Sequence, residues 1–350
     1  MELLYILQEA VRQKASDIFL IIGQPVAYKI QGAITRQETD ILTADQIKAL
    51  VKDMYTSADE RNLQLLQDGD DDFALSIRGV GRFRVNVYRQ RGTLSAVLRV
   101  VSFQLPQKEE YGIPDSIINL SNQKKGLILV TGPAGSGKST TLSYMLDEIN
   151  SKRNCHILTL EDPIEFLHKH KKSIVSQREI GLDTPNYSKG LRAAMRESPD
   201  VIFIGEMRDL ETIEIAMTAA ETGHLVLSTL HTVGASNTID RIIDVFPSNQ
   251  QQQIRVQLSM VLNAVVSQQL LPGEEGLLPA FEILEANSAI KTMIRDGKVH
   301  QIDSVIYSSA KDGMVSMDSS ILELYKKGKI SAQTAIAFSL NQDAMRRNVN

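Results

Sequence analysis

The sequence is poor in several features that mark whole classes of protein. It has one cysteine, Cys155, and no tryptophan among its 350 residues. A single cysteine excludes an internal disulfide framework and any metal site built from several cysteines. The longest apolar runs, such as Ile18–Ile22 and Met260–Leu262, fall far short of the roughly 20 residues of a membrane-spanning helix. Residues Met1–Ala10 lack the basic-then-apolar pattern of a secretion signal, so we expect an intracellular protein.

Neither sign of charge dominates the chain. Lys and Arg together number 38 against 42 for Asp and Glu, which gives a formal net charge of −4. This slightly acidic balance, without a stripe of aromatic and basic residues, predicts that no nucleic acid is a partner. Two local charge clusters, Asp68–Asp72 and Lys169–Lys172, are expected in solvated loops, the second together with His168 and His170.

Length and apolar content predict two domains with sizeable cores. Hydrophobic residues make up 43% of the chain, as in ordinary globular proteins. Residues 1–105 mix helix-like and strand-like patterns, which indicates a small α+β module. Residues 106–123, where prolines and a glycine stand among polar residues, are interpreted as a linker. From residue 124 to 350 strands alternate with helices, the pattern of a parallel α/β sheet.

Apolar periodicity predicts the individual elements. In the first domain we expect helices over Leu3–Val11 and Ala44–Tyr55, and strands at Phe19–Ile22, Ala27–Ile30, Phe73–Ile77, Phe83–Tyr88 and Ala96–Val101. In the second we expect strands at Leu127–Thr131, His156–Leu160, Val201–Gly205 and Leu225–Leu230, and helices at Gly190–Arg196, Leu210–Glu221, Gln250–Leu271, Ser319–Lys327 and Ser331–Phe338.

The most informative feature present is a complete phosphate-binding loop. An apolar strand runs into the spacing G-x-x-x-x-G-K-[ST], and a helical pattern follows directly. Lys138 is expected to reach the β- and γ-phosphates, and the Ser139 hydroxyl to ligate Mg²⁺. The helix N-terminus adds partial positive charge toward the phosphates. The chain is therefore expected to bind a nucleoside triphosphate, ATP, through Gly132, Pro133, Ala134, Gly135, Ser136, Gly137, Lys138, Ser139 and Thr140.

Acidic residues follow two of the predicted strands, where a parallel sheet places its chemistry. The strand ending at Gly205 is followed by Glu206, with the glycine in the place where this kind of strand usually ends in a magnesium-binding Asp. Glu161 and Asp162 end another strand. Carboxylates near Mg²⁺ hold its water shell and act as general base. Glu206 and Glu161 are thus the candidates for base and metal side; spacing does not decide between them, and we favour Glu206 as the base.

Two histidines bracket the strand Leu225–Leu230. His231, at the carboxyl end, is expected to face the γ-phosphate as a hydrogen-bond donor and sensor. His224 lies at the opposite end and is expected to have a structural or interface role.

Further motifs follow one another along nearly the whole chain, at Ala15–Asp17, Gly81–Asn86, Leu160–Phe166, Gly205–Ile213, Thr218–Val226, Thr238–Pro247 and Gln253–Pro272. In order and spacing they resemble the retraction motors of type IV pili, the PilT-like members of the type II/IV secretion ATPase superfamily. Leu160–Phe166 matches the acidic motif called the Asp box in that family, and glycine at 205 is itself a family feature.

The resemblance implies a fold and a set of partners. The fold is a PAS-like α+β N-terminal domain followed by a RecA-like P-loop ATPase domain with C-terminal helices. The assembly is a homo-hexamer at the cytoplasmic face of the membrane, held there only through partners such as the inner-membrane platform protein of the pilus machine. The implied activity is Mg²⁺-dependent ATP hydrolysis that drives pilus retraction and twitching motility.

Arginines of the N-terminal domain are candidates for the catalytic cation. A P-loop site without its own cation opposite the lysine commonly takes an arginine from elsewhere to neutralise transition-state charge. In the family such N-terminal arginines approach the nucleotide, and by that resemblance we carry the role over to Arg82, Arg84 and Arg99.

Three alternatives stay open. Extension and type II secretion ATPases of the superfamily usually have a longer N-terminal region and often a four-cysteine zinc motif, which one cysteine does not allow. Ser288–Lys298 instead resembles the C-terminal Ala-Ile-Arg-x-x-Ile-Arg helix of the retraction class, with Lys291 at the first arginine. A RecA-type nucleic-acid translocase would be stimulated by single-stranded DNA. A regulatory scaffold that binds nucleotide without turnover would release no phosphate.

Overall fold

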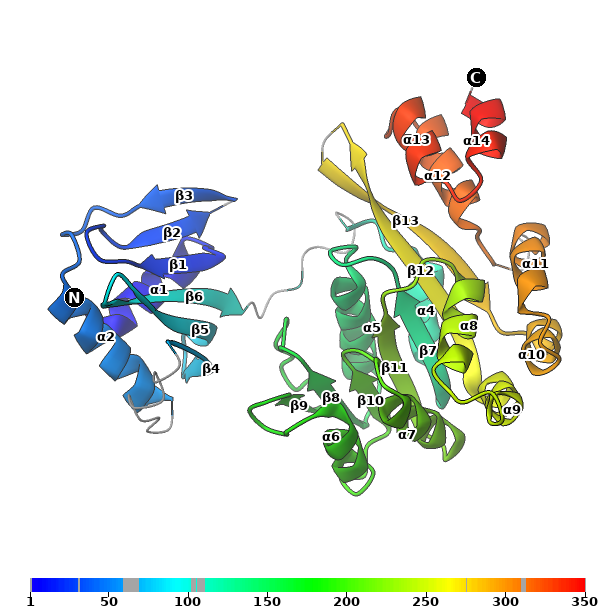
Figure 1. Cartoon of the computed structure of the whole chain (residues 1–350), viewed down its shortest axis with the longest axis horizontal. Coiled ribbons are helices and arrows are strands. Elements are labelled where there is room, and N and C mark those ends of the chain that lie inside the picture. The colour runs from blue at the N-terminus through cyan, green and yellow to red at the C-terminus, as the bar shows by residue number, and fades with distance from the viewer. Residues whose placement is uncertain are drawn as a thin grey trace. The chain divides into compact units, whose positions relative to one another are not determined.

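A computed structural model describes the chain except for residues 1, 31, 59–68, 102–104, 106–110, 275, 310–312 and 350. It divides into two compact units (Figure 1). The first comprises Met1–Gln104 with Glu165–Leu167, and the second Leu105–Ile164 with His168–Asn350.

In its described residues, the first unit is an antiparallel sheet with helices α1 and α2 on one face. Its strand order is β3-β2-β1-β6-β5-β4. Side chains alternate along the strands, so that Phe83, Val85 and Val87 of β5 enter the core while Arg84 between them is exposed. Thr43 and Gln46 form a capping box that begins the second helix. The elements are α1 Leu3–Arg12, β1 Asp17–Leu20, β2 Ala27–Ile30, β3 Ala33–Arg36, α2 Ala44–Ser57, β4 Asp70–Ile77, β5 Gly81–Gln90 and β6 Thr93–Val101.

The second unit is built on a mostly parallel sheet of order β13-β12-β7-β11-β10-β8-β9. Among the described strands of this sheet, only β13 runs antiparallel to its neighbour, β12. The central strands β7, β10 and β11 are buried along their whole length and mostly apolar because both faces are covered. The strands are β7 Gly126–Thr131, β8 His156–Glu161, β9 Ile174–Glu179, β10 Val201–Ile204, β11 Leu225–Leu230, β12 Leu262–Gly273 and β13 Gly276–Glu285.

Helices cover the two faces of this sheet with separate cores (Figure 1). Leu127 and Leu129 of β7 pack with α6 to α11, whereas Ile128 and Val130 pack with α4 and α5. The helices are α4 Asp115–Asn119, α5 Lys138–Lys152, α6 Tyr187–Ala194, α7 Leu210–Glu221, α8 Ala235–Asp244, α9 Gln251–Val261, α10 Ser288–Arg295 and α11 Ile302–Ser308.

A third core joins the C-terminal helices to the long hairpin of β12 and β13. Leu271 and Ala280 of the hairpin pack against Met317, Ile321 and other buried residues of these helices. The helices are α12 Met317–Lys326, α13 Ala332–Phe338 and α14 Gln342–Val349. The predicted helices at 319–327 and 331–338 are therefore confirmed.

One predicted helix is wrong in its second half. The helix expected over Gln250–Leu271 ends at Val261, and the chain continues as strand β12. Leu262 already has extended backbone angles, and the strand lies between β7 and β13 with most of its side chains buried. A continuous apolar run does not distinguish a buried helix from a strand buried on both faces. Strands β3, β9 and β13 were not predicted.

The expected linker also differs from the structure. Residues 115–122 form α4 and a short 3-10 helix, Leu120–Asn122, and Ile113, Ile117 and Ile118 are buried in the core beside α5. Residues 106–110 lie outside the described part of the chain. Apolar side chains spaced for one helix face anchor this segment to the second unit.

Of the two charge clusters expected in loops, one lies in a strand and the other in a loop. Asp70–Asp72, expected in a loop, opens strand β4 and pairs with β5, while Asp68 lies outside the described residues. Lys169–Lys172 is exposed and outside regular elements, as expected. His168 beside it is half-buried, and burial lowers the pKa of its imidazole. Among the described residues, no helix is long and apolar enough to cross a membrane.

Candidate nucleotide-binding site

The loop between β7 and α5 has the backbone geometry of a phosphate cradle. Gly132 and Gly137 have φ of 142° and 87°, a region that other residues rarely adopt. A Cβ on Gly132 would lie 2.1 Å from the main-chain oxygen of Gln268, and one on Gly137 would lie 2.6 Å from the Tyr111 hydroxyl. A Cβ on Gly135, between them, would meet nothing within 4 Å. The loop is thus packed tightly at both ends and open at its middle, where a phosphate chain approaches.

The N-terminus of α5 faces the same loop. Gly137 is its N-cap residue and has no side chain with which to cap the first turn. The first N–H groups of a helix lack partners within the helix and carry partial positive charge. Gly137 therefore leaves these donors for an anion.

Lys138 is held inside the cradle. Its side chain is largely buried, and its Nζ donates to the main-chain oxygens of Gly132 and Pro133, each at 2.9 Å. The same Nζ lies 3.5 Å from Nδ1 of His231. The ammonium group is thus already positioned among loop carbonyls, next to the strand end that carries His231.

His231 connects Lys138 to Glu206. Its Nε2 lies 3.2 Å from Oε1 of Glu206. Because a lysine ammonium only donates, Nδ1 accepts and the Nε2–H donates to the carboxylate; this tautomer is assigned from the partners. His231 lies between the loop lysine and the acidic strand end because β11 lies between β7 and β10 and all three strands are parallel; its role at the γ-phosphate stays a prediction.

The Glu206 carboxylate is ionised by its neighbours. Arg208 Nε lies 2.6 Å from its Oε1, and the Glu206 side chain is 16% exposed. Burial alone would raise the pKa of the Glu206 carboxyl, but the hydrogen bonds from Arg208 and His231, together with the charge of Arg208, outweigh burial and lower it. Arg208 was not singled out from the sequence, although it lies two residues beyond Glu206.

Tyr187 takes the space opened by the glycine before Glu206. A Cβ on Gly205 would lie 2.9 Å from the Tyr187 hydroxyl and 3.3 Å from the main-chain oxygen of Leu160. Burial, and then the charges of Asp162, Glu206 and Glu161, raise the pKa of the Tyr187 phenol. The Tyr187 hydroxyl thus stays a neutral hydrogen-bond donor near these carboxylates. The sequence indicated only that Gly205 stands where an aspartate is usual.

Glu161 ends β8, the strand beside β10, but its contacts differ from those of Glu206. It is 8% exposed, and its Oε1 accepts from the Thr159 hydroxyl at 2.7 Å and the Gln177 amide at 3.1 Å. The two predicted acids therefore lie on neighbouring strand ends with separate sets of partners.

Gln268 is a site residue that the sequence reasoning missed, because it was assigned to a helix. It is fully buried on β12, and its Oε1 accepts from the Thr141 hydroxyl of α5 at 2.7 Å. Its Nε2, like the Ser136 hydroxyl of the loop, is buried without a hydrogen-bond partner among the described residues. Two unpaired polar groups at a loop of this shape fit a site that binds a polar ligand.

His224 lies at the other end of β11, and the three predicted arginines belong to the first unit. His224 Nδ1 donates to the main-chain oxygen of Ala219 at 2.9 Å, which ties it to the end of α7. In the first unit, Arg84 of β5 is directly opposite Arg99 of β6, and Arg82 is on the same face of β5 two residues away. Arg99 is 69% exposed and pairs with Asp17 at 3.0 Å. The arginines thus gather on the sheet face opposite the core of their own unit.

The oxygen atoms at the loop fit magnesium. Mg²⁺ prefers hard oxygen ligands and keeps several waters. Ser139, in the first turn of α5, and the carboxylates of Glu161 and Glu206 supply such oxygens. Within the described ranges, no three His, Cys, Asp or Glu side chains form a metal-binding group. The donor set therefore suits an ion that arrives with a nucleotide and takes most of its ligands from phosphate and water.

Comparison with known proteins agrees with this geometry. Residues 2–342 match the family model described as type II/IV secretion system protein. The chain is 42% identical to the type IV pilus retractation ATPase PilT of Pseudomonas aeruginosa, covering 96% of this chain and 97% of that protein. It is 41% identical to a twitching motility protein of Neisseria gonorrhoeae, over 91% and 85% of the two chains.

A solved structure agrees as well. The pilus retraction motor PilT with bound ADP superposes with a TM-score of 0.89 at 46% identity, over 99% of both chains. Similarity of this extent covers both units and the phosphate-binding loop. The chain belongs to the type II/IV secretion system protein family, within which it is similar to the retraction ATPases of type IV pili.

Proposed function

We propose that this protein is a motor ATPase that couples Mg²⁺-dependent ATP hydrolysis to the retraction of type IV pili. The observation that carries the proposal is the series of contacts from Lys138 through His231 to Glu206 at a glycine cradle. It occurs in a chain that is similar over almost its full length to a named pilus retraction ATPase.

The cradle binds and orients the triphosphate. Lys138 moves its Nζ from the loop carbonyls to the β- and γ-phosphates, and the N–H groups of the first turn of α5 add further donors. Ser136 and Gln268 supply polar atoms that have no partner among the described residues. Mg²⁺, held by Ser139 and by water bound to Glu206 and Glu161, would neutralise charge that develops on the phosphates.

Glu206 acts as the general base. Its carboxylate orients the attacking water and takes a proton from it. His231 donates a hydrogen bond to this carboxylate and senses the presence of the γ-phosphate. Glu161 helps to bind Mg²⁺ rather than to activate water. Its Oε1 already accepts hydrogen bonds from Thr159 and Gln177, so it is less free to take a proton. A lowered pKa keeps Glu206 ionised at neutral pH.

The proposed architecture is a PAS-like domain followed by a RecA-like ATPase domain. An antiparallel sheet with two helices on one face supports the first description, and a parallel sheet with a P-loop after β7 supports the second. The working assembly is a homo-hexamer on the cytoplasmic face of the membrane, bound to the platform protein of the pilus machine. Arg82, Arg84 and Arg99 supply the cation that completes the site.

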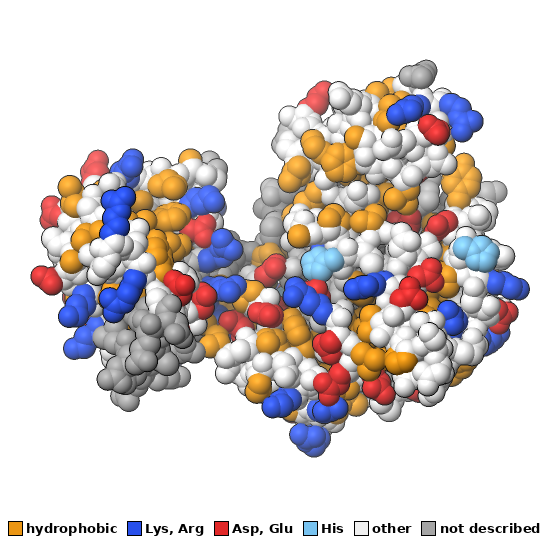
Figure 2. Space-filling model, in the orientation of Figure 1, with side chains coloured by type: hydrophobic (Ala, Val, Ile, Leu, Met, Phe, Trp, Pro, Cys, Tyr) orange, Lys and Arg blue, Asp and Glu red, His pale blue; other side chains and the backbone are white. Residues whose placement is uncertain are grey.

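The face of the molecule in Figure 2 shows positive and negative side chains interspersed, without a continuous basic stripe. A translocase on nucleic acid relies on such a stripe for affinity. The similarity over almost the full chain to a named pilus retraction ATPase favours the pilus motor over the RecA-type translocase.

The test is phosphate release by the purified chain, combined with pilus counts and twitching motility in a deletion strain. A retraction motor should hydrolyse ATP only with Mg²⁺, and the deletion should give excess pili without motility. Loss of pili would indicate an extension motor, and loss of export a type II secretion ATPase. Stimulation by single-stranded DNA would indicate a translocase, and absence of turnover a regulatory scaffold.

A further inference from the structure

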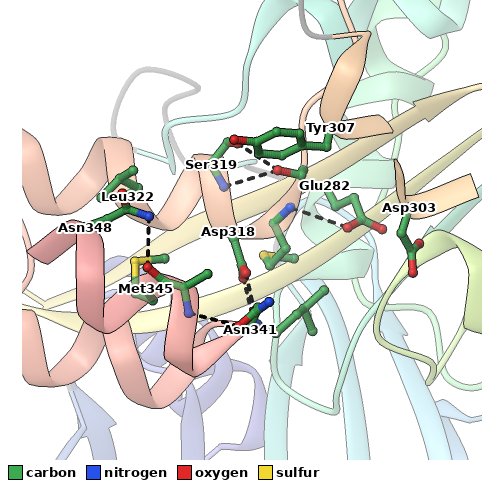
Figure 3. Close-up of a pocket in the computed structure, with 13 residues that line it drawn as sticks. Glu282, Asp303, Tyr307, Asp318, Ser319, Leu322, Asn341, Met345 and Asn348 are labelled. Atoms are coloured by element: carbon green, nitrogen blue, oxygen red, sulfur yellow. Dashed lines mark hydrogen bonds between the residues drawn. The ribbon is translucent and has the colours of Figure 1, made fainter. Parts of the chain in front are cut away.

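A cavity of about 580 Å³ lies among the C-terminal helices, apart from the phosphate-binding loop. Its walls come from β13, α11, α12 and α14 (Figure 3). Ligand-binding pockets typically measure about 300–1,000 Å³. The cavity is thus large enough for a small organic molecule, and the proposed motor function does not use it.

The charged side chains in the described part of the cavity wall are all acidic. Glu282 from β13, Asp303 from α11 and Asp318 from α12 line it, and among the lining residues that the structure describes none is Lys, Arg or His. Within the described residues, none of the three carboxylates forms an ion pair with a Lys or Arg side chain. Three charges around one cavity therefore lack a counter-charge from the described part of the chain.

The partners of these carboxylates are neutral. Glu282 is 3% exposed and accepts from the main-chain N–H groups of Ala235 at 2.7 Å and Met317 at 3.4 Å. Asp303 accepts from the Ser236 hydroxyl, and Asp318 from main-chain N–H groups. Burial, and then the charges of Asp303 and Asp318, raise the pKa of Glu282, so the other two carboxylates of the cavity disfavour its ionised form.

The rest of the lining is apolar or uncharged. Tyr307 and Leu340, which are 74% and 56% exposed, belong to the lining, as do Met317, Leu322 and Met345. Large exposed apolar side chains beside a concave site favour a ligand with an apolar part. The carboxylates are also too dispersed to form a metal-binding group, since no such group occurs in the described ranges.

We propose that this cavity binds a flexible organic polycation of the polyamine class, whose ammonium groups pair with Asp303, Asp318 and Glu282. Methylene chains between the ammonium groups match the apolar walls, and Tyr307 offers an aromatic face to a cation. Dispersed carboxylates suit several separated positive charges, whereas a single metal ion requires ligands that converge.

The test uses the full-length protein and spermidine as the probe, with isothermal titration calorimetry at about 150 mM salt, where exposed charges are largely screened. We expect saturable binding at one site per chain. Asp303→Asn keeps an oxygen for the Ser236 hydroxyl but loses the charge, and it should weaken binding about tenfold, the value of one charge-assisted contact. Tyr307→Ala, at a side chain that is 74% exposed, should weaken binding without disturbing the core.

Two controls separate this site from general attraction to an acidic protein. Asp343→Asn removes a carboxylate of α14 that is 85% exposed, pairs with Arg346 and does not line the cavity, so binding should be unchanged. 1,6-Hexanediol has a comparable chain without charge and should not bind. Equal affinity of the native chain, Asp303→Asn and Tyr307→Ala would overturn the proposal, as would complete displacement of spermidine by an equivalent concentration of Mg²⁺.

Discussion

At the scale of single residues, the site is a series of contacts from Lys138 through His231 to Glu206. The lysine and the carboxylate lie on opposite sides of one imidazole, at 3.5 and 3.2 Å. Substitutions at the two ends of this series should therefore affect different steps. A change at Lys138 should affect nucleotide binding, and a change at Glu206 should affect hydrolysis.

Lys138→Ala should abolish nearly all ATPase activity. The substitution removes the cation expected at the β- and γ-phosphates, and preorganised electrostatic donors of this kind are worth about 3–4 kcal/mol in the transition state. Phosphate release would be measured together with circular dichroism, which should show an intact fold. A folded variant that retains turnover would contradict the role assigned to Lys138.

Glu206→Gln should separate binding from chemistry. Glutamine keeps the shape and one acceptor oxygen but does not take a proton, so hydrolysis should fall by about 100-fold or more while nucleotide affinity survives. Glu161→Gln is the matched variant, because it makes the same change on the neighbouring strand end. If Glu161→Gln proved the more damaging of the two, the roles of base and support would be reversed.

At the scale of elements, Glu282 of β13 joins two helices. Its carboxylate accepts from Ala235, the first residue of α8, and from Met317, the first residue of α12. Through Thr238, α8 reaches Thr232, next to His231, with 2.7 Å between the two hydroxyl oxygens. One buried carboxylate thus connects the C-terminal helices to the segment that follows β11 and His231.

Glu282→Gln should change how stability depends on pH. The folded chain raises the pKa of Glu282 mainly through burial. Between its ordinary and its raised pKa the folded state holds a proton that the unfolded state releases, so this carboxyl lowers native stability as pH rises through that window. Thermal unfolding of both proteins, followed upward from about pH 4.3, the ordinary pKa of a glutamate, should show the native chain losing stability relative to the glutamine variant. A constant difference across this range would refute the assignment.

At the scale of the whole molecule, the two units are expected to act together. The second unit carries the loop, Glu206 and His231, whereas Arg82, Arg84 and Arg99 belong to the first. If one of these arginines completes the site, hydrolysis depends on the first unit while nucleotide binding does not.

A fragment of residues 105–350 should therefore bind nucleotide and hydrolyse it poorly. It begins before Ile113 because that residue and α4 are part of the second core. A missing arginine of this kind typically costs about a thousandfold in turnover. Phosphate release would be compared with that of the full chain at matched concentration, with binding of a fluorescent ATP analogue as the folding control.

In the full chain, Arg84→Lys keeps the charge without the planar fork and should also reduce turnover. Equal rates for fragment and full chain would show that the arginines are not needed.

The sequence alone predicted the loop, the strand before it and the helix after it correctly, because these features depend on contiguous residues. The glycines, Lys138 and the apolar strand before them determine a local geometry, and the same holds for α7, which was predicted at Leu210–Glu221 and found there. The order and spacing of motifs along the chain also indicate the family, because they are properties of the sequence itself.

Only the tertiary structure placed Gln268, Tyr187 and Glu282. Gln268 contacts Thr141 across 127 residues of sequence, and Glu282 contacts Ala235 across 47. Such pairs depend on the order of strands in the sheet, which local patterns do not specify, and the apolar run from Gln250 to Leu271 was ambiguous for the same reason. The sequence determined what the loop binds, because backbone conformation there is a local property. Folding decided which distant side chains surround it, because burial and strand order bring them together.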